Sequence, residues 1–237
     1  MDVANNPELF QSRKYKILHL ADALRKLVHV SGLTMKIDVV ITSPLLRTLQ
    51  TAAAVFGGGS YNDESGDPPL MVAGAGKSNR DAISSQNCPR FIAVELCRER
   101  MGVHPCDKRR SVKESKTLFP AVDFSQIASD EDNLWKKDYR ESPEEIAARG
   151  MKFLNWLWAR KEREIAIVTH SSFLYFTLKA FCEDGQPLSK HKLSKSFNNC
   201  ELRSLILVER RSSRPASSLT EKDCRKFDLK DYDHVMA

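Results

Sequence analysis

The sequence has no run of 18 or more apolar residues and no Cys-x-x-Cys pair. The first absence excludes a membrane-spanning helix. The second means that nothing indicates a zinc ribbon or a thioredoxin-type redox site. No stripe alternates basic with aromatic residues, so nothing indicates nucleic-acid recognition either. We therefore expect neither a membrane nor a nucleic acid as partner, and we expect no metal and no cofactor.

A secretory signal is also missing, because residues 1–10 carry Asp2 and Glu8 and lack an apolar core. The chain has six cysteines: Cys88, Cys97, Cys106, Cys182, Cys200 and Cys224. In a chain without a signal these are expected to be reduced thiols, as is usual in the cytosol. The sequence therefore predicts a cytoplasmic protein.

The composition is that of an ordinary globular protein. The 237 residues are 41% hydrophobic and 29% charged, which suits one domain or one domain with a large insertion. The net charge of +6 attracts anions. Because no basic and aromatic stripe accompanies it, the charge favours a small anionic molecule over a nucleic acid.

Strand and helix patterns alternate along the chain. Apolar runs predict strands at residues 16–20, 37–41, 91–97, 165–169 and 200–208. Helical patterns cover residues 21–29, 45–56, 143–161 and 173–181, and residues 102–134 show no regular period. The alternation predicts an α/β fold, a three-layer sandwich with a mostly parallel central sheet between helices.

Two helix starts have clear capping signals. Ser43 and Pro44 are expected to be the N-cap and the first residue of one helix. Ser142 and Glu145 have the spacing of a capping box, with Pro143 in the first turn. The first of these helices directly follows a buried strand, which is where ligand sites form in α/β sheets.

Two positively charged or titratable residues lie at such strand ends. Arg47 is in the first turn of the helix after strand 37–41, where its guanidinium can offer two parallel donors to a phosphate. His170 ends strand 165–169 and could hold a phosphate or carry a proton. The alternatives are a surface arginine and a histidine that neighbouring backbone satisfies.

A third strand end supplies carboxylates. Glu95 and Glu99 end or follow strand 91–97 and could act as an acid, unless they are simply solvated. The basic run 108–110 either lines a cleft or belongs to a solvated loop. Arginine, histidine and carboxylate at neighbouring strand ends together predict a phosphate-ester site.

Four segments carry a family resemblance: Thr42–Ala52 (TSPLLRTLQTA), Glu95–Arg110 (ELCRERMGVHPCDKRR), Ser129–Trp135 (SDEDNLW) and Glu164–Leu174 (EIAIVTHSSFL). They resemble the plant phosphoglycerate mutase-like proteins, which belong to the histidine phosphatase superfamily. The resemblance covers about residues 16–210 and implies a phosphoglycerate mutase-like fold. It also implies a phosphatase that moves a phosphoryl group to a histidine and then to water, and it leaves the substrate open.

The resemblance also divides the chain and assigns roles. Residues 1–15 are an N-terminal extension, residues 16–209 the histidine phosphatase-like domain, and residues 210–237 a polar tail that is expected to be disordered. Arg47 matches a phosphate-binding arginine and His170 the second histidine of the site. Ser171 and Ser172 follow that histidine, and the family usually has glycine at the second of these positions.

The acid of the family falls in the segment with Glu95 and Glu99. Glu99 is favoured because the family's acid usually sits just before a glycine-containing turn, and Glu95 is the alternative.

The family's nucleophile has no match. The resemblance implies an Arg-His pair at the end of the first strand, in a run such as HLVRHAQG. The chain has six histidines, none of which follows an arginine: His19, His29, His104, His170, His191 and His234. His19 matches an earlier, non-catalytic histidine of that run. The chain then passes from Leu20 to Ala21 without the loop and the LTPLGW-like motif that the family has there.

Three interpretations remain open at this point. The protein is a phosphatase by descent, a non-catalytic protein that holds a phosphorylated ligand, or a truncated splice or gene-model product. All three imply a small phosphorylated substrate or ligand as partner. The sequence leaves the oligomeric state and the identity of that molecule open.

Overall fold

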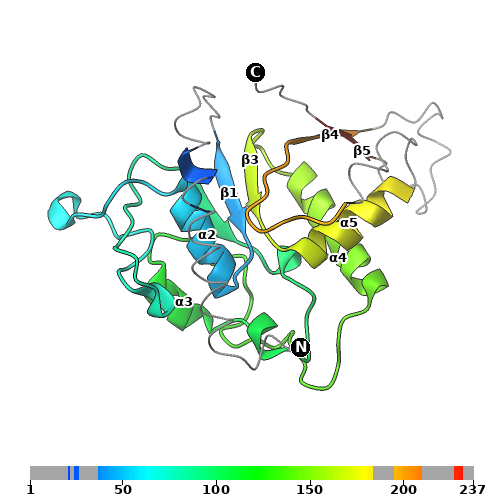
Figure 1. Cartoon of the computed structure of the whole chain (residues 1–237), viewed down its shortest axis with the longest axis horizontal. Helices are drawn as coiled ribbons and strands as arrows, with labels where there is room; N and C mark the ends of the chain where they lie inside the picture. Colours follow the sequence, from blue (N-terminus) through cyan, green and yellow to red (C-terminus); the bar gives the residue numbers. More distant parts are fainter. Residues whose placement is uncertain (1–20, 22–23, 27–36, 184–194, 210–226, 232–237) are drawn as a thin grey trace.

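The computed structural model describes residues 21, 24–26, 37–183, 195–209 and 227–231 (Figure 1). The strands are β1 (Val39–Thr42), β2 (Arg90–Ala93), β3 (Ile165–Val168), β4 (Leu205–Glu209) and β5 (Phe227–Asp231). The longer helices are α2 (Leu46–Phe56), α3 (Val112–Leu118), α4 (Pro143–Trp158) and α5 (Ser171–Glu183). The predicted strand at residues 16–20 lies outside the described residues, as does most of the predicted helix 21–29.

The central sheet has the order β2-β1-β3, and both pairs of strands are parallel. Thr42, the last residue of β1, lies opposite Ala93 of β2 and Val168 of β3. The three strands therefore end level with one another, at one edge of the sheet. This arrangement confirms the predicted α/β fold with a mostly parallel sheet.

Helices cover both faces of this sheet, because successive side chains of a strand point to opposite faces. Val40 and Phe91 belong to the apolar cluster that includes α2, whereas Ile41 and Ile92 belong to the cluster that includes α4 and α5. Figure 1 shows α2 on one side of β1 and the pair α4 and α5 on the other. The result is three layers, with the core divided between the two interfaces.

The start of α2 differs from the prediction. The helix begins at Leu46, and its N-cap is Leu45, whose side chain makes no capping hydrogen bond. Ser43 is not the cap because it still belongs to the sheet edge, where its amide donates to the Val168 carbonyl at 3.0 Å. Pro44 therefore precedes the helix. The helix ends at Phe56 with Gly57 as its C-cap, as the run of glycines predicts.

The capping box of α4 is confirmed. The Ser142 hydroxyl accepts from the Glu145 amide at 3.3 Å, and the Glu145 carboxylate accepts from the Ser142 amide at 2.7 Å. Further along α4, Gly150 lies against Thr177 of α5, and a Cβ at Gly150 would overlap that side chain. The glycine thus lets the two helices approach closely on one face of the sheet.

The segment between β2 and α4 is less regular than the rest. Strand β2 ends at Ala93, and a 3-10 turn, η4 (Glu95–Cys97), takes over where the sequence predicts more strand. A second turn, η5 (Pro105–Asp107), precedes α3. Helix α3 starts with a capping box of Ser111 and Glu114, which the sequence analysis did not recognise in the irregular stretch.

A second, smaller sheet joins β4 and β5 in antiparallel register. The predicted strand 200–208 is confirmed only from Leu205 onward. Residues 227–231, within the segment expected to be a disordered tail, form β5. Their sequence, FDLKD, alternates apolar and charged residues in the period of a strand, and this short signal is easily missed in a polar segment. No helix within the described residues combines the length and the apolar character that a membrane crossing needs.

Candidate functional site

The three strand ends predicted to form a site do meet at one edge of the sheet. The Val94 amide, just after β2, donates to the Thr42 carbonyl at 2.9 Å. The Ser43 amide, just after β1, donates to the carbonyl of Val168 at the end of β3. Helices α2 and α5 begin within a few residues of this edge. Their N-terminal amides add partial positive charge there.

His170 lies at this edge, directly before α5, and is only 6% exposed. Its Nε2 atom is 2.8 Å from the Ser43 hydroxyl. Burial lowers the pKa of His170 well below its usual value, and the nearby charges of Arg47, Arg149 and Arg98 lower it further. The imidazole is therefore neutral at pH 7 and acts as a hydrogen-bonding group rather than as a cation.

Ser43 belongs to the site, although the sequence predicts a helix cap at this position. Its hydroxyl contacts His170 across the sheet edge. The two residues are 127 positions apart in the sequence, so local patterns carry no signal for this pair. The available signal is topological, because each residue directly follows one of two neighbouring parallel strands.

Arg47 is held against the η5 turn rather than left on an open helix surface. Its Nη1 donates to the Cys106 carbonyl at 2.6 Å and its Nη2 to Asp107 Oδ1 at 2.8 Å. The side chain is nevertheless 41% exposed. Its guanidinium is thus oriented by the protein and still accessible to a ligand.

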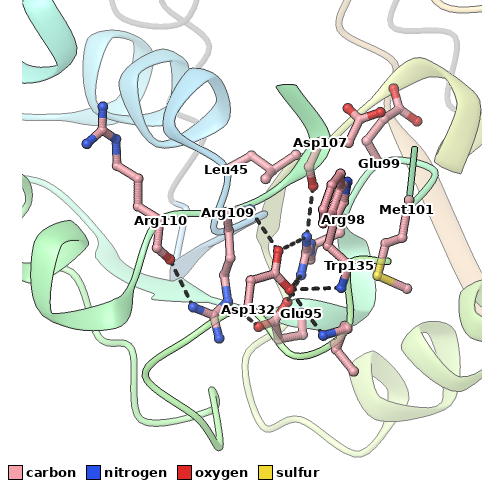
Figure 2. A network of polar contacts seen from close by, with 12 residues as sticks. Leu45, Glu95, Arg98, Glu99, Met101, Asp107, Arg109, Arg110, Asp132 and Trp135 are labelled. Carbon is pink, nitrogen blue, oxygen red and sulfur yellow. Dashed lines mark hydrogen bonds and ion pairs between the residues drawn. The ribbon is translucent and has the colours of Figure 1, made fainter. Parts of the chain in front are cut away.

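The two candidate acids have different surroundings. Both Glu95 oxygens are engaged, one by Arg98 Nη1 at 2.9 Å and the other by Arg109 Nε at 2.5 Å. Glu99 is half-buried, and among the described residues its carboxylate accepts only from the Arg100 amide, at 3.0 Å. Figure 2 shows Glu99 apart from the ion pairs of Glu95. Of the two, Glu99 is the carboxylate available to a ligand.

Arg98 anchors a buried network that the sequence analysis missed (Figure 2). Its side chain is 0% exposed and donates to both Asp132 oxygens, at 2.8 and 2.7 Å. Burial lowers the pKa of Arg98, but Asp132 and Glu95 outweigh this effect and raise it. Burial likewise raises the pKa of Asp132, and the bond from Arg98 reverses the shift. Both groups are therefore charged in the folded protein.

The basic run 108–110 is divided, because Lys108 and Arg110 are exposed, as expected of a solvated loop, whereas Arg109 is not. Arg109 is buried and donates to the backbone carbonyls of Ser129, Asp130 and Glu131 as well as to Glu95. It ties the η5 segment to residues 129–131. Arg110 is exposed and pairs only loosely with Glu114, at 3.8 Å.

Arg149, on α4, fixes the backbone around Glu99. It donates to both Glu141 oxygens, at 2.8 and 2.7 Å, and to the carbonyls of Leu96, Arg98 and Glu99. Arg149 thus fixes the segment that contains Glu99 through its backbone carbonyls and leaves the Glu99 carboxylate accessible.

The remaining predicted residues are placed as follows. Ser171 is exposed and Ser172 half-buried in the first turn of α5, and neither hydroxyl bonds to another described residue. His19 and His29 lie outside the described residues. His104 is an exposed residue at the start of η5. Within the described part of the chain, His170 is thus the histidine that lies at the sheet edge.

Comparison with known proteins shows the family to which the chain belongs. No family model matches the chain. It is 60% identical to phosphoglycerate mutase-like protein 1 of Arabidopsis thaliana over 84% of its own length and 71% of that protein's. It is 56% identical to a second Arabidopsis phosphoglycerate mutase-like protein, over 80% of its own length and 70% of that protein's. The chain belongs to the phosphoglycerate mutase-like proteins.

A third relative agrees with this membership. The chain is 50% identical to phosphoglycerate mutase-like protein 2 of Arabidopsis thaliana, over 80% of its own length and 62% of the length of that protein. The chain therefore spans less than two thirds of this relative. These relatives confirm the resemblance to the plant phosphoglycerate mutase-like proteins that the sequence motifs indicate.

Proposed function

We propose that this phosphoglycerate mutase-like chain binds small phosphorylated molecules at the carboxyl edge of the β2-β1-β3 sheet and does not hydrolyse them through a phosphohistidine. The observation that carries the proposal is Arg47. Its guanidinium is oriented by Asp107, remains 41% exposed and lies in the first turn of α2. A guanidinium beside helix N-terminal amides is a preferred phosphate ligand.

The electrostatics of the edge support an anionic ligand. Arg47, Arg149 and Arg98 all lie near enough to His170 to lower its pKa. Two of these three are buried and paired with carboxylates, so Arg47 is the one with accessible donors. The overall charge of +6 adds a weaker attraction at long range.

The expected loss of turnover rests on the absent nucleophile. In the family mechanism, an imidazole nitrogen attacks phosphorus, the leaving oxygen departs with a proton from the acid, and water then cleaves the P–N bond. Removing a covalent nucleophile lowers kcat by about 10⁶-fold in a serine protease. His170 is a poor substitute, since it is buried and its Nε2 is bonded to Ser43.

The free thiols support a reducing compartment. Cys88, Cys97 and Cys106 are free thiols, and burial raises the pKa of Cys97 to about 12. Such a thiol is inert at neutral pH. On this basis we propose the cytosol as the site of action.

Binding is tested by thermal shift and calorimetry with inorganic phosphate and orthovanadate. Ligand at 100 times its Kd should stabilise the chain by about 2.7 kcal/mol. Arg47→Ala should weaken binding at least tenfold. Arg90→Ala is the matched control, because Arg90 is an exposed arginine at the opposite end of the strands. Equal binding by wild type and Arg47→Ala would contradict the proposal.

Turnover is tested with p-nitrophenyl phosphate at neutral and acidic pH. We expect no release above background. A kcat of about 1 s⁻¹ or more, which follows the protein through purification and is lost in Arg47→Ala, would show that the chain is an active phosphatase.

The availability of Glu99 favours a second candidate, a phosphatase by descent that lacks only its first motif. Inserting a family-like stretch between Leu20 and Ala21, with an Arg-His pair, a loop and an LTPLG-like turn, should then restore hydrolysis. The restored activity should fall in Glu99→Gln, most visibly with alkyl phosphates, whose leaving oxygen needs a proton. A folded insertion variant that stays inert on a broad phosphate-ester panel would exclude this candidate.

A further inference from the structure

We infer that Arg140 is a second anion-binding guanidinium of this site and that the Asp107 carboxylate sets it beside Arg47. The inference rests on the proposed phosphate site and names a residue of it that the sequence patterns do not single out. Arg140 is far from Arg47 in the sequence and precedes the capping box of α4.

The two arginines share one carboxylate. Asp107 is 5% exposed. Its Oδ1 accepts from Arg47 Nη2 at 2.8 Å, and its Oδ2 accepts from Arg140 Nη1 at 2.8 Å. Asp107 thus bridges the two guanidinium groups. Two positive charges against one negative charge leave a net positive charge at this point.

Arg140 keeps a pair of donors free. Both hydrogen bonds of the Arg140 side chain to described residues come from Nη1, which donates to Asp107 and to the Gly102 carbonyl at 2.6 Å. Its Nε and Nη2 bond to no other described residue, and these two N–H groups form the side-on fork that binds a phosphate or carboxylate with two parallel bonds. The Arg140 side chain is 24% exposed, whereas that of Arg98 is 0% exposed.

The backbone that holds Arg140 is constrained in an uncommon way. Gly102 has φ +88°, and a Cβ there would overlap the Tyr139 carbonyl. Val103 follows with φ +63°, a conformation that β-branched residues rarely adopt. Its amide donates to the Lys136 carbonyl at 2.9 Å. The turn therefore packs directly against the segment before Arg140, and strained backbone of this kind clusters at functional sites.

The experiment measures phosphate and orthovanadate binding by calorimetry for wild type, Arg140→Gln and Arg110→Ala. Glutamine can still donate to the Gly102 carbonyl but lacks the charge and the fork. Arg110→Ala removes the same charge from the neighbouring loop, at a residue that does not contact Asp107. Urea unfolding of each variant shows that it is folded, and Arg140→Lys provides a second variant that keeps the charge without the fork.

We expect Arg140→Gln to weaken binding at least tenfold, Arg140→Lys to fall between it and wild type, and Arg110→Ala to stay within twofold of wild type. Wild-type affinity in Arg140→Gln, with binding lost in Arg47→Ala, would overturn the inference and leave the proposed site intact. Equal weakening in Arg110→Ala and Arg140→Gln would overturn it as well, because net charge alone would then explain the effect. A wild-type protein that binds neither anion would refute the proposed function and the inference with it.

Discussion

Two sets of arginines lie near the same sheet edge and differ in how completely the fold uses them. Arg98, Arg109 and Arg149 are at most 9% exposed, and each donates to a carboxylate and to at least one backbone carbonyl. Arg47 and Arg140 share the single carboxylate of Asp107, and their side chains are 41% and 24% exposed. The first set holds the irregular segment between β2 and α4 together, and the second is the set that we propose binds the ligand.

This difference shows that an arginine's role is set by its partners rather than by its neighbours in the sequence. Arg109 lies in a basic run that could attract a ligand, yet its guanidinium donates to the backbone carbonyls of residues 129–131. Arg140 lies in no such run, yet it retains a free fork. The predictions below test this division, from the largest expected effect to the smallest.

Loss of a buried arginine should be the most damaging change. Arg98→Met leaves Asp132 without its guanidinium partner in a buried site and leaves Glu95 with Arg109 alone. Breaking a buried ion pair on one side costs about 3–5 kcal/mol, and urea unfolding should show a loss of this size. Arg47→Ala should cost less than about 1 kcal/mol, because Arg47 is 41% exposed and Asp107 keeps Arg140 as a partner. Similar losses for the two variants would contradict the division.

The two candidate acids, Glu95 and Glu99, should likewise differ in how much their substitution lowers the free energy of unfolding. Glu95→Gln weakens contacts with two buried guanidinium groups, so it should cost about 1.5–3 kcal/mol in unfolding free energy. Glu99→Gln should change stability by no more than about 0.5 kcal/mol, because its carboxylate accepts from a single backbone amide within the described part of the chain. If Glu99→Gln is the more destabilising variant, Glu99 is a structural residue and not the available acid.

Acid should destabilise the edge through His170. Its pKa in the folded chain lies well below that of an unfolded histidine, about 6.5. The unfolded state therefore binds a proton that the folded state does not, and stability falls as the pH drops below 6.5 toward the folded pKa. Between pH 7.5 and 5.5 the expected loss is on the order of 1 kcal/mol. Urea unfolding of His170→Gln should show a correspondingly smaller pH dependence; an identical dependence would mean that His170 titrates normally.

Part of this architecture follows from short-range patterns. The apolar runs around Val40 and Ile167 predict parallel strands, and the Ser142 capping box predicts the start of α4, because backbone sterics and local hydrogen bonds decide these features. The meeting of Arg47 and His170 at one edge follows from the topology of such a sheet.

Other features depend on contacts that no local pattern encodes. Ser43 has the sequence context of a helix cap, but its amide completes the sheet edge and its hydroxyl pairs with His170. The partner of Arg98 is Asp132, 34 positions away, within a segment that lacks any period. The family resemblance favours Glu99 over Glu95 as the acid, but the ion pairs that engage Glu95 depend on the packing of Arg98 and Arg109.

The central claim is that the edge binds a phosphate monoester without cleaving it, and ³¹P NMR of p-nitrophenyl phosphate mixed with the chain tests both halves at once. We predict that the ester resonance broadens in proportion to the protein, that Arg47→Ala abolishes the broadening, and that no resonance of inorganic phosphate grows over hours. A protein-dependent inorganic phosphate signal that disappears in Arg47→Ala, or an ester resonance that the protein leaves unchanged, would contradict the account.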